Sequence, residues 1–161
     1  MDRIGRFEKV TRERFEADFA GDPSGLYEGL ELPVRATSGS AGYDFHTPCD
    51  LTLRPGESIR VATGIRVHIA DGWLLMIAPR SGLGYKYRVQ LDNTVGIIDS
   101  DYYYSDNEGH IQIKITNDSK EGKVLELKKG DRFAQGIFLP YGITEDDEAK
   151  GVRNGGFGST R

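Results

Sequence analysis

From residue 50 onward the chain consists of short apolar runs separated by turn residues, and no other feature constrains the fold as much. The runs are rich in β-branched and aromatic residues, and several alternate between apolar and polar positions, which is typical of strands packed on one face. The pattern predicts strands over Ser58–Ala62, Ile65–Ile69, Trp73–Ala78, His110–Ile115, Val124–Leu127 and Arg132–Leu139. Turn residues predict turns at Arg54–Glu57, Ala70–Gly72 and Lys128–Asp131. The fold class is therefore all-β, and the pattern alone leaves a sandwich, a jelly roll and a barrel open.

The two ends of the chain differ from this central region. Thr11–Phe19 is predicted to form a helix, because its first residue can cap it and two phenylalanines lie four residues apart on one face. Residues 21–32 are loop-like, and the tail begins with the acidic run Glu145–Glu148 and ends in glycines. A length of 161 residues suits a single domain. We therefore divide the chain into an N-terminal extension (1–32), a β domain (33–144) and an acidic hinge with a flexible glycine-rich arm (145–161).

Composition disfavours several classes of function. A net charge of −4 without a dense Lys/Arg stretch argues against binding to a nucleic-acid polymer. The single cysteine, Cys49, provides neither a disulfide framework nor a cysteine-rich zinc site, which suits a reducing, cytoplasmic setting. No apolar run approaches the ~20 residues of a membrane helix, and the first residues lack the apolar core of a signal peptide. The histidines have no spacing typical of a metal cluster or a nucleophile–base pair, which indicates structural or surface roles for His46, His68 and His110.

Three stretches carry residues suited to nucleotide chemistry. Arg80–Gly84 brings a guanidinium, a hydroxyl and permissive backbone to the end of a strand, where they could hold phosphate, although taken alone the stretch favours an ordinary turn with an exposed arginine. Asn93–Asp99 places a carboxylate directly after an apolar run, where it could activate a water or simply end a strand in a turn. Gly151–Thr160 combines glycines, an arginine, a phenylalanine and hydroxyls, which could bind phosphate and stack on a base, or form a disordered tail.

Five motifs in order resemble those of the homotrimeric dUTP pyrophosphatase (dUTPase) family: Ala41–Phe45, Pro79–Gly84, Gly96–Tyr102, Arg132–Ile137 and Arg153–Thr160. The resemblance runs from about Pro33 to the C-terminus. It implies a dUTPase-like β-barrel or jelly-roll subunit that acts on dUTP as a homotrimer. It also implies hydrolysis of dUTP to dUMP and pyrophosphate, which limits uracil in DNA and supplies dUMP for dTMP synthesis.

The resemblance also implies roles for individual residues. Asp99 resembles the catalytic base that activates a water for in-line attack on the α-phosphorus, and Tyr102 resembles the aromatic that packs under the deoxyribose and excludes a 2′-hydroxyl. The hairpin whose amides pair with uracil is represented by Asn93, Gly96, Ile97 and Ile98, while the phosphate group supplied by a neighbouring subunit is represented by Arg80, Ser81 and Gly82.

The remaining motif residues resemble contacts to the phosphates, the metal and the base. Gln112 and Gln135 resemble substrate-binding residues, whereas Arg132 resembles a residue that supports the architecture. Asp44 is similar to a carboxylate near the water shell of Mg²⁺, which the family holds mainly through the triphosphate itself. The tail that closes over the nucleotide from another subunit is represented by Arg153, Phe157, Gly158 and Ser159. Each site would then draw on three chains.

Two departures from the family pattern stand out: an insertion, Tyr103–Glu108, precedes Gly109, and residues 1–32 exceed the family minimum. The alternative enzymes are a dCTP deaminase or a bifunctional deaminase–dUTPase, although no motif supplies the glutamate base that deamination needs. From another class, a dUTPase scaffold could have a second role in binding a regulatory protein, which the insertion and the extension would suit.

Overall fold

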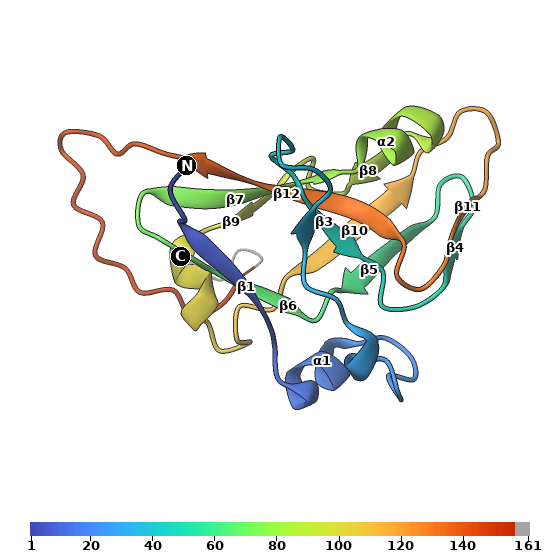
Figure 1. Ribbon diagram of the computed structural model, residues 1–161, viewed down its shortest axis with the longest axis horizontal. Coiled ribbons are helices and arrows are strands. Elements are labelled where there is room, and N and C mark those ends of the chain that lie inside the picture. The colour runs from blue at the N-terminus through green and yellow to red at the C-terminus, as the bar shows by residue number, and fades with distance from the viewer. Residues whose placement is uncertain (157–161) are drawn as a thin grey trace.

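A five-stranded sheet runs through the computed structural model, which describes residues 1–156 (Figure 1). All its neighbouring strands pair antiparallel. In spatial order they are β2 (Val34–Arg35), β3 (Tyr43–His46), β12 (Arg132–Pro140), β7 (Trp73–Pro79) and β9 (Gly96–Ile98). The motif residues Asp44, Gln135 and Ile98 all lie on this sheet.

Three smaller sheets complete the β structure of the described chain. The first has three strands, in the order β5 (Ser58–Ala62), β10 (Gln112–Asn117) and β8 (Val89–Leu91). The second pairs β4 (Leu51–Leu53) with β11 (Leu125–Leu127), and the third pairs β1 (Gly5–Lys9) with β6 (Ile65–Ile69). Their inward residues and those of the central sheet form one apolar core that includes Phe45, Leu75, Ile115 and Phe133. In β6, Ile65, Val67 and Ile69 are buried while the residues between them are half-buried, as alternation predicts. The all-β class is confirmed.

The N-terminal residues are joined to this core. The predicted helix is present as α1 (Arg12–Asp18), with the Thr11 hydroxyl accepting from the Arg14 amide at 3.2 Å. Its Phe15 is fully buried in a second apolar cluster with Val10, Leu30 and Ala62. A short 3₁₀ turn, η1 (Tyr27–Gly29), contributes Tyr27 to the edge of that cluster. The extension therefore adds a core of its own.

Besides strands β2, β3, β4, β8 and β9, which were not among the predicted strands, the structure differs from the sequence-based expectations at three places. Arg80–Gly84 leads from strand β7 into a helix, α2 (Ser81–Tyr87). The sequence indicated only a turn here, because two glycines give the segment a low helix propensity. Strand β1 was not expected, since GRFEK has no apolar alternation and its place is set by pairing with β6. Strand β10 starts at Gln112 and leaves His110 outside the ladder.

The segment after β12 lies away from the sheets. It leaves the end of β12, swings outward and returns beside a second 3₁₀ helix, η2 (Ser100–Tyr104) (Figure 1). Residues 141–152 are all exposed, whereas Arg153 is partly shielded. Within residues 1–156, no helix is both long enough and apolar enough to cross a membrane.

Candidate active site

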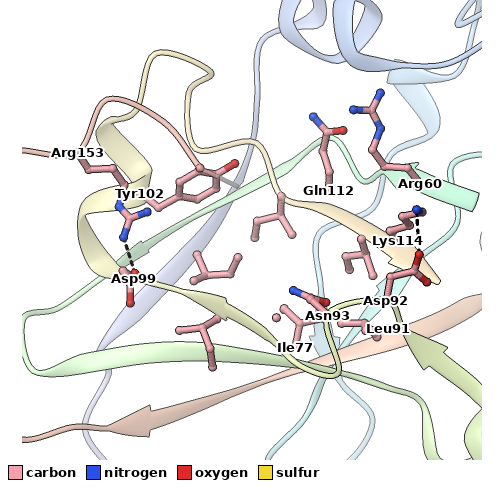
Figure 2. A pocket seen from close by; sticks show the side chains of 16 residues that line it. Arg60, Ile77, Leu91, Asp92, Asn93, Asp99, Tyr102, Gln112, Lys114 and Arg153 are labelled. Atoms are coloured by element: carbon pink, nitrogen blue, oxygen red, sulfur yellow. Dashed lines mark hydrogen bonds and ion pairs between the residues drawn. The ribbon is translucent and has the colours of Figure 1, made fainter. Parts of the chain in front are cut away.

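A cavity of about 500 Å³ opens between the β8–β9 hairpin, strand β7, η2 and the start of β10. Its apolar lining comes from Ile77, Leu91, Ile98, Ile111 and Ile113. Figure 2 shows Asp99 and Arg153 at one end and Asp92 with Lys114 at the other, with apolar side chains between them. A cavity with apolar walls and charged side chains at its rim suits a planar, partly apolar ligand that also carries polar or charged groups.

The β8–β9 hairpin forms one wall. Its turn is tight: the Thr94 amide donates to the Leu91 carbonyl at 2.9 Å, and Thr94 has a φ of 70°. Gly96 lies against Ile77 on β7, and a Cβ there would stand 3.1 Å from the Ile77 Cβ. Glycine therefore lets the hairpin backbone approach β7. The predicted residues Asn93, Gly96, Ile97 and Ile98 all line the cavity, where backbone amides can read the polar edge of a base.

Asp99 follows directly after β9 and lies on the rim. Its Oδ2 accepts from Arg153 Nη2 at 2.5 Å, while Asp101 Oδ1 accepts from Arg153 Nε at 2.8 Å. The arginine belongs to the same chain, so the arm lies over its own Asp99 in the described structure. The Asp99 side chain keeps 45% of its surface exposed, which leaves it accessible to a water and a substrate.

Tyr102 forms a second wall from η2, and only 6% of it is exposed. Its hydroxyl donates to the His110 carbonyl at 2.8 Å and accepts from Asn107 Nδ2 at 2.9 Å. Burial raises the pKa of Tyr102, so the hydroxyl stays protonated as a donor. Gly156 packs against the ring, where a Cβ would stand 2.8 Å from Tyr102 Cε2. The ring is thus held in one position.

Gln112 also lines the cavity, and its buried Oε1 has no hydrogen-bond partner within residues 1–156. An unsatisfied buried acceptor is costly, and a ligand donor would relieve that cost. The sequence did not single out three charged residues of the rim: Arg60, Asp92 and Lys114. Lys114 and Arg60 are opposite each other on β10 and β5, and Lys114 Nζ lies 3.0 Å from Asp92 Oδ2. Asp92 directly precedes the predicted hairpin residue Asn93, whereas only strand pairing, which local sequence does not reveal, could have located Arg60 and Lys114.

A second group of motif residues lies on the central sheet outside this cavity. Asp44 is 6% exposed, and its two oxygens face Arg80 Nε at 3.4 Å and Arg132 Nη1 at 3.0 Å. Gln135 is the strand partner of Asp44, and its Nε2 donates to the Pro79 carbonyl at 3.3 Å. Ser81 and Gly82 are exposed at the start of α2, next to Arg80. Hydroxyl, amide and guanidinium donors therefore lie close together here, as phosphate binding requires.

The two groups are far apart in one chain. Ile98 pairs with Leu75, and Arg80 follows Leu75 by five residues, which corresponds to about 17 Å along the strand. The Arg80 guanidinium also faces Asp44 on β3, three strands away from β9 in the sheet order. A single triphosphate does not span this separation. Within one chain, the structure thus brings together the candidate catalytic base, the candidate sugar-packing residue and the uracil-hairpin candidates. It does not bring the candidate phosphate-binding residues to the same cavity. The predicted Phe157, Gly158 and Ser159 lie outside the described residues.

Comparison with known proteins decides the family. The sequence model of the dUTPase family matches residues 28–161. The deoxyuridine 5′-triphosphate nucleotidohydrolase of Lactococcus lactis is 40% identical over 135 residues, which cover 82% of this chain and 89% of that protein. This chain belongs to the dUTPase family.

Other dUTPases are also similar to this chain in sequence or in structure. The Shigella sonnei nucleotidohydrolase is 42% identical over 135 residues, covering 79% of this chain and 85% of that protein. The crystal structure of the Streptococcus mutans dUTPase superposes with a TM-score of 0.67 at 32% identity, covering 86% of this chain and 98% of that one. The Staphylococcus bacteriophage 80alpha dUTPase with dUPNHPP shares the fold at 20% identity, with a TM-score of 0.67 and 99% coverage of both chains.

The family match begins at residue 28, so β1 and α1 precede the part of the chain that the dUTPase model covers. Among residues 1–156, no group of three or more His, Cys, Asp or Glu side chains is arranged to hold a metal ion. Asp44 is the one predicted metal-associated residue, and both of its oxygens face arginines.

Proposed function

We propose that this chain hydrolyses dUTP to dUMP and pyrophosphate, with Asp99 as the base. One observation carries the assignment of the site: a single cavity joins the Asn93–Ile98 hairpin, the Tyr102 ring and the partly exposed Asp99 carboxylate in a member of the dUTPase family. The chemistry of these groups matches the three parts of the substrate that must be recognised or attacked.

Uracil is read by the hairpin backbone in this proposal. Its amide and carbonyl groups between Asn93 and Ile98 pair with the base, and cytosine presents the wrong pattern of donors and acceptors. The close approach of Gly96 to Ile77 keeps the pocket narrow, which disfavours the methyl group of thymine. Tyr102 packs under the sugar, and its fixed ring leaves no room for a 2′-hydroxyl.

Hydrolysis requires a water oxygen to attack the α-phosphorus in line with the leaving group. Asp99 orients that water and accepts its proton, while the bond between the α-phosphorus and the bridging oxygen breaks. The electron pair of that bond leaves with pyrophosphate. Preorganised donors near the phosphates stabilise the developing negative charge, which is the role proposed for Arg80, Ser81, Gly82 and Gln135.

We propose that these phosphate donors come from a neighbouring copy in a homotrimer. The separation of about 17 Å along β7 supports this, because Arg80 and Asp99 of one chain cannot hold the same triphosphate. The arm is proposed to close over the site of another subunit, with Arg153 and Ser159 on phosphate and Phe157 stacked on uracil. The exposed linker 141–152 gives the arm the length and freedom to leave its own chain.

Magnesium is proposed as the cofactor, bound mainly by the triphosphate. Mg²⁺ prefers oxygen ligands and keeps several waters, so a carboxylate can reach it through its water shell. Asp44 fits this outer position, since it stands beside the phosphate donors but has arginines on both oxygens. When bound, Mg²⁺ neutralises phosphate charge.

The function can be tested by measuring pyrophosphate release from dUTP, the four usual dNTPs and UTP. We expect that, among these nucleotides, only dUTP is hydrolysed at a high rate. Asp99→Asn should lower that rate by about 10²–10⁴-fold and leave dUTP affinity nearly unchanged. Asp101→Asn is the matched control, because Asp101 also pairs with Arg153 but lies outside the cavity lining. Equal losses in both variants would contradict the base assignment, and ammonia release from dCTP would favour the deaminase alternative.

A further inference from the structure

The two departures from the family pattern touch each other in space. The Glu108 carboxylate, at the end of the insertion, accepts from the Thr11 amide at 2.9 Å and from the Thr11 hydroxyl at 2.7 Å. At the other end of the insertion, the Tyr103 hydroxyl donates to Glu8 Oε2 at 2.8 Å. The insertion is therefore bound to β1 and to the start of α1, residues that precede the family match.

A hydrogen-bonded pair, a partly exposed Asp18 and a buried His110, lies at the same contact. His110 is fully buried, and its Nε2 accepts from the Gly64 amide at 2.8 Å. The ring proton must then be on Nδ1, which donates to Asp18 Oδ2 at 2.6 Å. Arg14 Nη2 donates to the other Asp18 oxygen at 2.7 Å. Because a backbone amide occupies Nε2, this pair cannot take a proton from a substrate, and it serves to join α1 to the chain at His110.

The Asp18–His110 pair is connected to the candidate active site through Tyr102. The carbonyl of His110 accepts the Tyr102 hydroxyl, and Asn107 of the insertion donates to the same hydroxyl. Gly109 packs against the Tyr102 carbonyl with a φ of 68°, so no side chain fits between the insertion and η2. Glu108 itself has a φ of 61°, a costly conformation for a residue with a Cβ, and its carboxylate contacts on Thr11 hold it there.

We propose that α1 is a positioning element for the active site: Asp18 and Glu108 fix His110 and Asn107, which set the place of the Tyr102 ring and thereby the discrimination between deoxyribo- and ribonucleoside triphosphates. This rests on the proposed role of Tyr102 under the sugar. A small shift of the ring opens room for a 2′-hydroxyl while leaving Asp99 and the uracil hairpin in place. Loss of Asp18 should therefore change selectivity more than it changes turnover of dUTP.

The test measures kcat/KM for dUTP and for UTP in Asp18→Ala, Asp18→Asn and Glu108→Gln, together with their thermal unfolding. We expect the dUTP/UTP ratio to fall at least about tenfold in Asp18→Ala, within the ~100-fold that a 1 Å misplacement can cost. Asp18→Asn should restore most of the ratio, because its amide oxygen can still accept from His110 Nδ1. Glu13→Ala is the matched control, as Glu13 is exposed on the same helix, and it should leave the ratio unchanged.

Three outcomes separate the possibilities. A ratio that stays at the parent value in Asp18→Ala and Glu108→Gln, with only a lower melting temperature, would mean that α1 merely stabilises the fold and would overturn the inference. Should Asp18→Ala not fold, Glu108→Gln decides it, since it keeps the side-chain volume but replaces one of the two carboxylate oxygens that accept from Thr11, and an unchanged ratio there would overturn the inference. Tyr102→Ala identifies the source of a failure. An unchanged ratio there overturns the sugar role and the inference with it, whereas a changed ratio there with none in the α1 variants overturns the inference alone.

Discussion

The proposal that Asp99 of one chain and Arg80 of a neighbouring chain form one site can be tested by combining two weakly active variants in one assembly. Asp99→Asn removes the proposed base, and Arg80→Ala removes a proposed phosphate donor. Arg80 keeps 38% of its side chain exposed and Asp44 retains Arg132 as a partner, so Arg80→Ala should fold with little loss of stability. The two variants are mixed in equal amounts, unfolded, refolded together and assayed for pyrophosphate release.

The expected activities follow from the geometry. Alone, Asp99→Asn should lose about 10²–10⁴-fold, and Arg80→Ala roughly 10- to 150-fold, the equivalent of one charge-assisted hydrogen bond of ~1.5–3 kcal/mol. In mixed assemblies, a site that takes Asp99 from one chain and Arg80 from its neighbour is intact when the first chain is Arg80→Ala and the second is Asp99→Asn. Random mixing makes about a quarter of the sites intact, so activity should rise to about a quarter of the parent value.

A site built within one chain gives a different result. Every chain in the mixture then carries one defect, and the activity should equal the mean of the two variants measured separately. Differently tagged chains and native mass spectrometry would establish that mixed assemblies are present. Mixed trimers without recovered activity would refute the shared site, as would a native mass that corresponds to a single chain.

Three further predictions concern stability and the arm. Phe15→Ala should lower the free energy of unfolding by about 3–5 kcal/mol in chemical denaturation, because Phe15 is fully buried in the second apolar cluster; a loss below ~1 kcal/mol would mean that the extension hardly contributes. Burial lowers the pKa of His110 against the opposing effect of Asp18, with Arg14 and Glu108 also nearby. The unfolded chain therefore takes up a proton near pH 6.5 that the folded chain does not, and stability should fall below that pH by at most about 1.4 kcal/mol per unit, a slope that His110→Gln should reduce. Truncation before Gly151 should leave the melting temperature nearly unchanged but lower dUTP turnover, since none of the described residues that it removes belongs to either apolar cluster; an equally active truncated chain would remove the arm from the mechanism.

Local sequence patterns predicted those parts of the fold whose structure depends on neighbours in the chain. The strands β5 and β6 were predicted with the bounds they have, and α1 was predicted from a capping threonine and two phenylalanines. The family resemblance also predicted eight residues that the structure brings to one cavity: Asn93, Gly96, Ile97, Ile98, Asp99, Tyr102, Gln112 and Arg153. The role of each remains a prediction.

Contacts between distant segments were not predictable in the same way. Asp18 and His110 are 92 positions apart, and neither has a spacing that distinguishes it from a surface residue. His110 was expected to be structural or on the surface, and its burial decides for the former. Arg60 and Lys114 become neighbours only through the pairing of β5 with β10. Such contacts depend on register and burial, which a single sequence does not specify.

Arg153 links the closure of the arm to the chemistry of the base. In the described chain its guanidinium donates to Asp99 Oδ2 and Asp101 Oδ1, and only 19% of the side chain is exposed. The proposed reaction needs the same carboxylate to hold a water and accept its proton, so the guanidinium and the water compete for Asp99. A triphosphate offers Arg153 several anionic oxygens in a geometry suited to bidentate hydrogen bonds. Substrate binding would therefore draw Arg153 from Asp99 to phosphate, which would free the Asp99 oxygen that the guanidinium occupies.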